Sequence, residues 1–254
     1  MDRVSEYSYR GGHGKVSQDQ GMREAKSAAT TTVGTVKPLQ GEKEILYVRL
    51  STAAAVAQAR LVQAPAIVAN HQAVAVNATA SIGAKVVTVL LGATAATKDQ
   101  YANGLFVVAS GAGSGYSYVI DNHLSAAASA VVELNLRDEL EVAVSTLSIT
   151  QLVADPYFNA IAMPAAGLTG KPLGVTLISA ALGSYVWLGK KGRWMGYVES
   201  TAITVGQRVI PGCAAGTIQG CVESLDATAN KPILGFGVAT AAAANSYGLV
   251  DFKL

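Results

Sequence analysis

The sequence predicts an all-β protein: a multi-stranded β-sandwich or barrel body, a small terminal barrel-like module and an extended N-terminal arm. Three observations lead to this fold class. Hydrophobic residues make up 50% of the 254 residues and charged residues only 14%, which is enough to bury a large core. From residue 43 onward, short β-branched or aromatic runs alternate with Gly, Asn, Asp and Pro. Residues 1–42, in contrast, show no sustained period of 2 or 3.6 residues.

Residues 1–42 form the predicted arm. They are rich in Gly, Ser, Thr, Gln and Lys, as expected of a segment without a core of its own. Two interpretations stay open, a free tail or an arm that becomes ordered on a neighbouring subunit. A fully extended segment of about 40 residues reaches on the order of 130 Å. Exchange of the arm between neighbouring subunits is therefore geometrically possible.

Residues 43–182 form the predicted β-rich body. Its runs have the length of single strands, and most alternate in character; examples are "EKEILYVRLS", "AKVVTVLLG", "GLFVVAS" and "VVELNL". Residues 52–64 and 123–134 resist this assignment, because both are rich in alanine and favour a helix by propensity. A short helix in either stretch is compatible with the sequence.

Residues 183–254 form the predicted terminal module, in which glycine recurs every few residues. This punctuation is typical of tight hairpins in a small Greek-key or barrel-like unit. Trp187 and Trp194 flank the sequence "LGKKGR", which predicts a hairpin with facing tryptophans and a turn over residues 189–192. Such a tip presents cations that either contact an acidic partner surface or simply keep the protein soluble. The residues assigned to partner contacts are Arg3, Tyr7, Tyr9 and Arg10 of the arm and Lys190, Lys191 and Arg193 of this tip.

The loop "GAGSGY" raises the question of a phosphate site. Its glycines Gly111, Gly113 and Gly115 do not match G-x-G-x-x-G, and the aromatic, alternating run that follows is typical of a strand and not of a helix. No Gly-Lys-Ser/Thr sequence completes a P-loop. The loop is therefore predicted to join two strands, with glycine supplying positive φ angles.

No other motif indicates catalysis, a metal or a cofactor. His13, His71 and His123 each lack a second ligand at metal spacing, and we interpret them as structural or surface residues. Asp138, Glu139 and Glu141 lack calcium-loop spacing and are interpreted as a solvated turn. No G-x-S-x-G elbow occurs, and Cys213 and Cys221 are interpreted as reduced, partly buried thiols. The expectation is a protein that is not an enzyme.

The charge and hydropathy patterns limit the partners. A net charge of +2 is too small for the one-signed field that nucleic-acid binding usually needs. The longest apolar runs fall short of the roughly 18 residues of a membrane span. We therefore expect a soluble protein with neither a nucleic-acid nor a membrane partner.

Several segments between residues 65 and 254 resemble structural proteins of tailed bacteriophages. The segments "DQYANGLFVVASGAGSGYSYVIDNH", "VVELNLRDELEVAVSTLSITQLVADPYFNAIAMP" and "GVTLISAALGSYVWLGKKGRW" are similar to phage proteins of unassigned or capsid-associated role. The sequences "VGQRVIPGCAAGTIQGCVES" and "ILGFGVATAAAANSYGLVDFKL" resemble the small β-domains of capsid decoration (cement) proteins. This likeness is one of pattern, without a single diagnostic motif.

The resemblance implies a non-enzymatic virion protein that binds the outer surface of the phage head and stabilises contacts between capsomers. Its implied partners are the major capsid protein and further copies of itself, with a homotrimer favoured and a dimer as the alternative. The implied location is the virion head surface, with the host cytoplasm during assembly. The chain departs from the smaller decoration proteins in length, because it carries over a hundred residues before the terminal module.

That extra length keeps one alternative open, and a second alternative comes from a different class of protein. The first is a head-fibre, neck or tail component that binds a receptor or glycan, with Tyr185, Trp187 and Trp194 as sugar-stacking aromatics. The second is a β-fold polysaccharide hydrolase, which needs two facing carboxylates. Its candidates are Asp121, Glu133, Asp138, Glu139, Glu141 and Asp155, and their spacing favours no pair.

Overall fold

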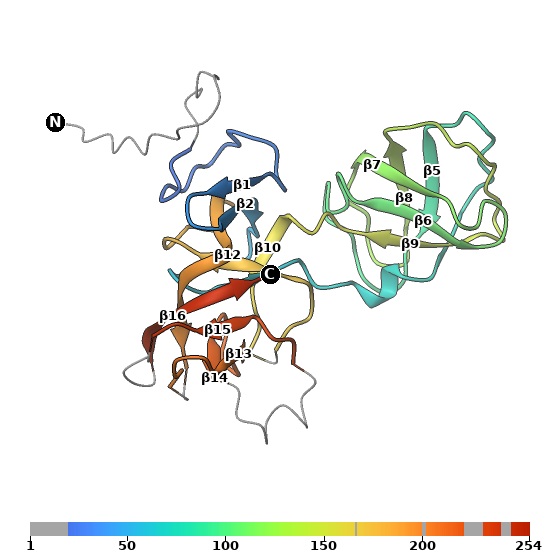
Figure 1. Cartoon of the computed structure of the whole chain (residues 1–254). Coiled ribbons are helices and arrows are strands. Elements are labelled where there is room, and N and C mark those ends of the chain that lie inside the picture. The colour runs from blue at the N-terminus through green and yellow to red at the C-terminus, as the bar shows by residue number, and fades with distance from the viewer. Residues whose placement is uncertain (1–19, 166, 200–201, 221–230, 240–244) are drawn as a thin grey trace.

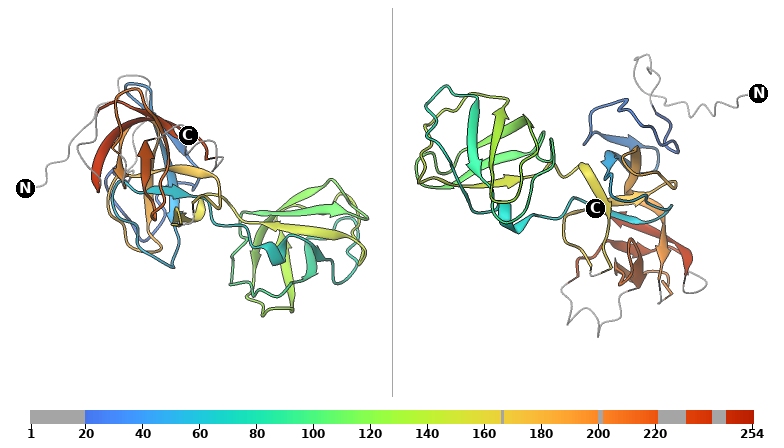
Figure 2. Two further views of the ribbon diagram at one scale, coloured as in Figure 1. Left: turned by 90° about the horizontal axis from the view of Figure 1, so that it is seen from below. Right: turned by 180° about the vertical axis from the view of Figure 1, so that it is seen from behind.

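The computed structural model describes residues 20–165, 167–199, 202–220, 231–239 and 245–254. Within these ranges the protein is all-β, as the sequence predicts, and the one helical element is the short 3₁₀ turn η1 (Ala69–His71). No helix in this part of the chain is long and apolar enough to cross a membrane. The strands form two lobes, which are separate in each of the views in Figure 1 and Figure 2.

The first lobe, here the base lobe, contains ten strands from both ends of the described chain. Its pairing order is β1-β2-β10-β3-β11-β12-β14-β13-β15-β16, and β12 also pairs with β2 and β16. The pairings therefore close into two rings that share β12. The strands are β1 (Val36–Leu39), β2 (Lys43–Leu50), β3 (Leu61–Gln63), β10 (Phe158–Ala162), β11 (Pro172–Thr176), β12 (Tyr185–Val198), β13 (Arg208–Pro211), β14 (Ile218–Gly220), β15 (Gly235–Gly237) and β16 (Ser246–Lys253).

The second lobe, here the inserted lobe, is a sheet of six strands in the order β4-β9-β6-β7-β8-β5. An isolated bridge between Val76 and Val89 brings its two edges together, so the sheet curls around a core of its own that includes Phe106 and Leu134. The chain enters this lobe after β3 and returns at β10. The strands are β4 (Val74–Ala75), β5 (Val86–Leu90), β6 (Leu105–Ser110), β7 (Ser117–His123), β8 (Val131–Leu136) and β9 (Ile149–Val153).

The glycine loop lies in the inserted lobe and joins β6 to β7. These two strands pair antiparallel, so the prediction of a strand-to-strand connection is confirmed. Gly111, Gly113 and Gly115 have φ angles of 82°, 77° and 89°. Residues with a side chain rarely adopt this left-handed region of the backbone. The turn therefore explains the three glycines, and a phosphate-binding role is not needed to explain them.

The two alanine-rich stretches are not helical. In each, a residue makes an isolated bridge, a residue three positions later has a positive φ, and a strand follows. In the first stretch Val56 bridges to Ala180 and Ala59 has φ 57°; in the second Ala126 bridges to Ala96 and Ser129 has φ 57°. A left-handed residue ends any helix, so tertiary pairing overrides the helix propensity of alanine here.

Ser129 offers a test of this arrangement of a bridge followed by a left-handed residue, because it is an exposed non-glycine residue with a positive φ. The substitution Ser129→Gly is expected to raise the free energy of unfolding by up to about 1 kcal/mol, since it removes the clash of Cβ with the backbone. The matched control is Ala127→Gly in the same loop, where φ is not positive and glycine should destabilise. Urea denaturation measures both, and a loss of stability in Ser129→Gly would contradict the assignment.

The lobes divide the chain differently from the regions 1–42, 43–182 and 183–254 of the sequence analysis. Strand β12, from the expected terminal module, pairs along its first half with β2, from the expected body. The expected body is itself interrupted, because residues 66–155 belong to the linkers and the inserted lobe. Long-range strand pairing, and not glycine spacing, sets the boundaries.

Residues 20–39 form a strap across the base lobe, although the sequence analysis assigned them to the arm. The side chain of Gln20 is buried and accepts a hydrogen bond from the Tyr47 hydroxyl at 2.8 Å. The side-chain amide nitrogen of Gln20 donates to the backbone carbonyl oxygen of Tyr185. The backbone carbonyl oxygen of Gln20 accepts a hydrogen bond from Trp187 Nε1 at 3.1 Å. Lys26 forms an isolated backbone β-bridge to Tyr185, and β1 pairs with β2. The strap is part of the base lobe.

The predicted hairpin around residues 189–192 is wrong, because β12 runs without a turn from Tyr185 to Val198. Its pairing partner changes here instead: β2 pairs with its first half, and β16 pairs from Lys191 onward. A Cβ at Gly189 would lie 2.6 Å from the Trp194 ring, and one at Gly192 would lie 2.9 Å from Lys43. The glycines mark close packing at this crossover.

Candidate functional site

The residues predicted for partner contacts divide into two groups. Arg3, Tyr7, Tyr9 and Arg10 lie outside the described residues. Lys190, Lys191 and Arg193 lie within β12 and not on a loop tip.

The cations of β12 face charged groups of neighbouring strands. The Nζ atoms of Lys190 and Lys191 lie 3.5 and 3.7 Å from the Glu44 carboxylate, while Arg193 is exposed opposite Asp251 of β16. Lys191 and Arg193 also border a hollow of about 1030 Å³ beside Lys43, Asp251 and Lys253. Two of the three predicted cations are therefore partly neutralised within the chain.

The aromatics proposed for sugar stacking do not form an exposed surface. Trp187 and Trp194 are 2% and 9% exposed, and Tyr185 stacks on Tyr47 with ring centroids 6.1 Å apart. Lys43 lies over the Trp194 ring at 5.1 Å. These side chains belong to the core of the base lobe, so that part of the glycan hypothesis is wrong.

Two of the three histidines meet in the inserted lobe, which their sequence positions do not indicate. His71 and His123 are buried on either side of Tyr101. Nδ1 of His71 contacts the Tyr101 hydroxyl, and Nε2 of His123 accepts the Tyr101 backbone N–H at 3.0 Å. Burial raises the pKa of Tyr101. Both histidines are structural, as predicted, and His13 lies outside the described residues.

The acidic group and one cysteine are also placed. Asp138, Glu139 and Glu141 are exposed in the loop after β8, in keeping with the predicted solvated turn. Cys213 is exposed and not partly buried, whereas Cys221 lies outside the described residues. Among the residues that the structure describes, no group of three or more His, Cys, Asp or Glu side chains is placed to hold a metal ion.

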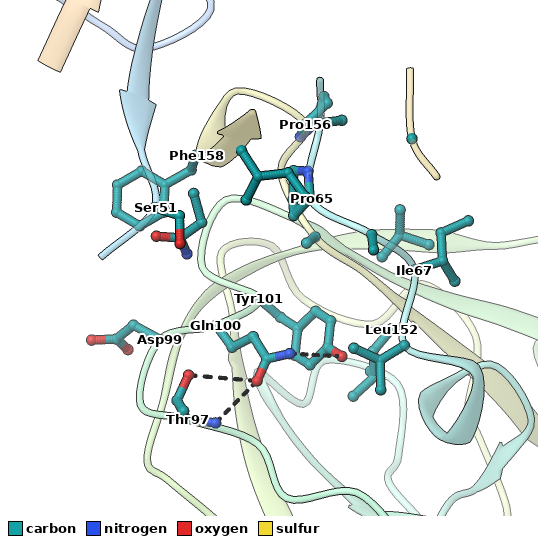
Figure 3. A pocket seen from close by; sticks show the side chains of 18 of the residues that line it. Ser51, Pro65, Ile67, Thr97, Asp99, Gln100, Tyr101, Leu152, Pro156 and Phe158 are labelled. Carbon is teal, nitrogen blue, oxygen red and sulfur yellow. Dashed lines mark hydrogen bonds between the residues drawn. The ribbon is translucent and has the colours of Figure 1, made fainter. Parts of the chain in front are cut away.

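A groove of about 860 Å³ lies between the two lobes (Figure 3). Phe158 and Ser51 of the base lobe line one side, and Gln100 and Tyr101 of the inserted lobe line the other (Figure 3). The linkers between the lobes add apolar side chains, of which Ile67 is 69% exposed. The lining combines these apolar side chains with polar and charged ones, and a concave surface of this size is large enough to hold a ligand.

Several polar groups of the groove make contacts within the chain. Arg49 donates to Asn159 Oδ1 at 2.9 Å and lies over the Phe158 ring at 4.5 Å. Gln100 accepts the Thr97 backbone N–H at 3.0 Å. The charged lining residues are three cations, Arg49, Lys98 and Lys171, and one acid, Asp99. The excess of cations suits a ligand that is neutral or acidic. The side chains that the chain already holds in place can bind such a ligand and orient it.

Asp155 lies in the linker directly beside this groove. Burial raises the pKa of Asp155, while the Tyr157 backbone N–H, which donates to its carboxylate at 2.8 Å, acts in the opposite direction. The Asp155 carboxylate fixes the turn through which the linker enters β10.

Glu199 fixes the turn between β13 and β14. Its Oε2 accepts the backbone N–H groups of Cys213 and Ala214 at 2.5 and 2.8 Å and the Thr217 hydroxyl at 3.0 Å. Burial acts to raise the pKa of Glu199, but these hydrogen bonds and the charge of Lys231 together lower it below its ordinary value.

This lowered pKa predicts a pH dependence of stability. A group whose pKa is lower in the folded state stabilises above its unfolded-state pKa, and that stability is lost as the pH falls through the folded pKa. The difference in unfolding free energy between the protein and Glu199→Gln is therefore expected at neutral pH and should vanish in acid. Urea denaturation across the acidic range measures it, and a difference that is independent of pH would contradict this role of the carboxylate.

Comparison of the chain with protein-family models, curated protein sequences and solved structures finds no match in any of the three. The assignment of a function therefore depends on the residues and geometry of the chain itself.

Proposed function

We propose that the protein is a non-enzymatic structural component of a phage particle, one that binds the outer surface of the head and stabilises contacts between capsomers. The base lobe is the part that attaches to the major capsid protein, with the arm extending the attachment to a neighbouring capsomer. The inserted lobe stands away from the base lobe and faces the solution. The resemblance behind this proposal is one of sequence pattern, and the comparisons add no family to it.

The observation that carries the proposal is the anchoring of the strap. Gln20, the first described residue, is fixed to the base lobe by its hydrogen bonds to Tyr47, Tyr185 and Trp187. An arm must transmit load from its binding site to the body that it tethers. A buried glutamine with hydrogen bonds to three residues of the closed sheet is suited to that role.

The role of the arm in attachment can be tested by a truncation that leaves Gln20 in place. Deletion of residues 1–18 is expected to weaken attachment to heads and to leave the unfolding transition unchanged, because the strap and Gln20 remain. Gln20→Ala is the comparison variant and is expected to lower the unfolding free energy by about 1–3 kcal/mol, since it leaves buried partners unsatisfied. Co-sedimentation with heads lacking the protein measures attachment. Full binding by the truncated protein would contradict the role of the arm.

The groove between the lobes favours a second candidate function, a head-fibre, neck or tail component that binds a receptor or glycan. Its concave shape and its combination of Phe158, Asn159 and Gln100 suit such a ligand. Location in the particle distinguishes the two functions. Many copies on the head lattice favour decoration, whereas copies confined to one vertex or to the tail favour the receptor-binding role.

A further inference from the structure

The groove between the lobes carries positive charge that the chain does not neutralise. Its three cations are Arg49 near the end of β2, Lys171 directly before β11 and Lys98 of the inserted lobe. In the described part of the chain, no acidic side chain forms an ion pair with any of them. Asp99, the acid of the lining, accepts the His123 backbone N–H at 3.1 Å instead. The charge of the groove is therefore complementary to an acidic ligand.

The linker from β3 into the inserted lobe, residues 64–68, lines the groove with unpaired backbone (Figure 3). Ala66 and Ile67 are exposed, and within the described residues neither of their N–H groups donates to another part of the chain. Their carbonyl oxygens likewise accept no hydrogen bond from the described residues. Val68 continues the segment in an extended conformation, with φ −85° and ψ 105°. Such a segment can pair with an added strand of another molecule.

The apolar part of the lining favours a peptide over a glycan. Ile67 is 69% exposed and Val153 of β9 is 37% exposed, so both offer contacts to apolar side chains of a ligand. Open aromatic faces are scarce, because Arg49 covers one face of the Phe158 ring at 4.5 Å and Tyr101 is only 2% exposed. Sugars stack on open aromatic rings, whereas an added strand places alternate side chains against apolar and polar neighbours.

We propose that the groove binds an extended, acidic segment of a partner protein. The segment pairs with the backbone of residues 66–67, sets its carboxylates against the three cations and places its alternate apolar side chains on Ile67 and Val153. This inference goes beyond the head-attachment role, because it assigns a ligand to the groove wherever the base lobe is attached. For the second candidate function, it names the class of receptor as a protein segment.

Fluorescence anisotropy with three labelled octapeptides tests the class of ligand. The peptides alternate valine with glutamate, with serine or with lysine. The glutamate peptide is expected to bind, the serine peptide to bind more weakly and the lysine peptide not to bind, because only the first complements the cations. An oligosaccharide of uronic acids serves as the glycan competitor and is expected not to displace the glutamate peptide. The proposal would be overturned by the absence of glutamate-peptide binding at millimolar concentration, by equal binding of the lysine peptide or by displacement with the oligosaccharide.

Two pairs of variants test the position of the site. Lys98→Glu is expected to weaken binding of the glutamate peptide about three- to tenfold, because an exposed attraction becomes a repulsion. Its matched control is Lys85→Glu, which reverses an exposed lysine of the same lobe outside the groove. Ile67→Asp is expected to weaken binding as well, and its control is Leu124→Asp, since Leu124 is 74% exposed and does not line the groove. Test and control variants with equal affinity would overturn the position.

Methylation of the peptide nitrogens tests the backbone pairing. Successive N–H groups of a strand point to opposite sides, so methylation of all valines or of all glutamates removes one side's donors. At least one of the two methylated peptides is expected to lose binding, and equal affinity of both with the parent peptide would overturn the pairing. The protein without residues 1–18 is expected to bind the parent peptide normally, which separates this site from attachment to heads.

Discussion

Replacement of Trp187 by alanine is expected to lower the free energy of unfolding of the base lobe by about 3–5 kcal/mol. Trp187 is 2% exposed, and its ring centroid lies 4.9 Å from that of Tyr47. Its Nε1 also donates to the Gln20 carbonyl oxygen, so the substitution releases the strap as well as emptying the core. Because a domain is stable by only about 5–15 kcal/mol, this loss is a large fraction of the total.

Urea denaturation measures the effect, and limited proteolysis reports on the strap. Trp187→Phe is the graded control, since it keeps an aromatic ring and loses the hydrogen bond to Gln20. Phe236→Ala is the surface control, because Phe236 is partly exposed, and its expected effect is smaller. If Trp187→Ala destabilised no more than Phe236→Ala, the assignment of Trp187 to the core would be wrong.

Replacement of Phe106 by alanine is expected to destabilise the inserted lobe by about 3–5 kcal/mol while the base lobe stays protected. Phe106 is fully buried and packs near Tyr118 in a core that shares no residue with the two clusters of the base lobe. Separate cores lose stability separately when the contacts between them are few.

Hydrogen exchange resolved by peptide distinguishes the lobes. In Phe106→Ala, the amides of β5 to β9 are expected to lose protection, and those of β2, β12 and β16 to keep it. Val250→Ala is the reciprocal variant, because Val250 is fully buried in the base lobe. Equal loss of protection in both lobes would contradict the division of the chain into two cores.

The fold class could be predicted from the sequence because its signals are local. A run such as "GLFVVAS" alternates over the length of a strand, and the glycines after it provide the positive φ angles of a turn. The alanine-rich stretches are compatible with a helix by propensity, whereas each makes an isolated bridge, at Val56 and at Ala126, followed by a residue with a positive φ. No residue type at Ala59 or Ser129 announces that positive φ, so the sequence does not reveal it.

The lobe boundaries and the groove could not be predicted because they depend on contacts between distant segments. β2 pairs with β10 and with β12, both more than a hundred residues further along the chain. The groove likewise combines Arg49 with Gln100 and Phe158. The glycines at 189 and 192 predict a turn, since a single sequence does not distinguish a turn from a strand that changes partner.

A cryo-EM reconstruction of the virus particle that encodes this chain tests the central claim most directly. The proposal predicts many copies on the head lattice, with the base lobe against the capsid surface and the inserted lobe pointing outward. Absence of the protein from the head, with copies only at one vertex, only on the tail or nowhere in the particle, would contradict it.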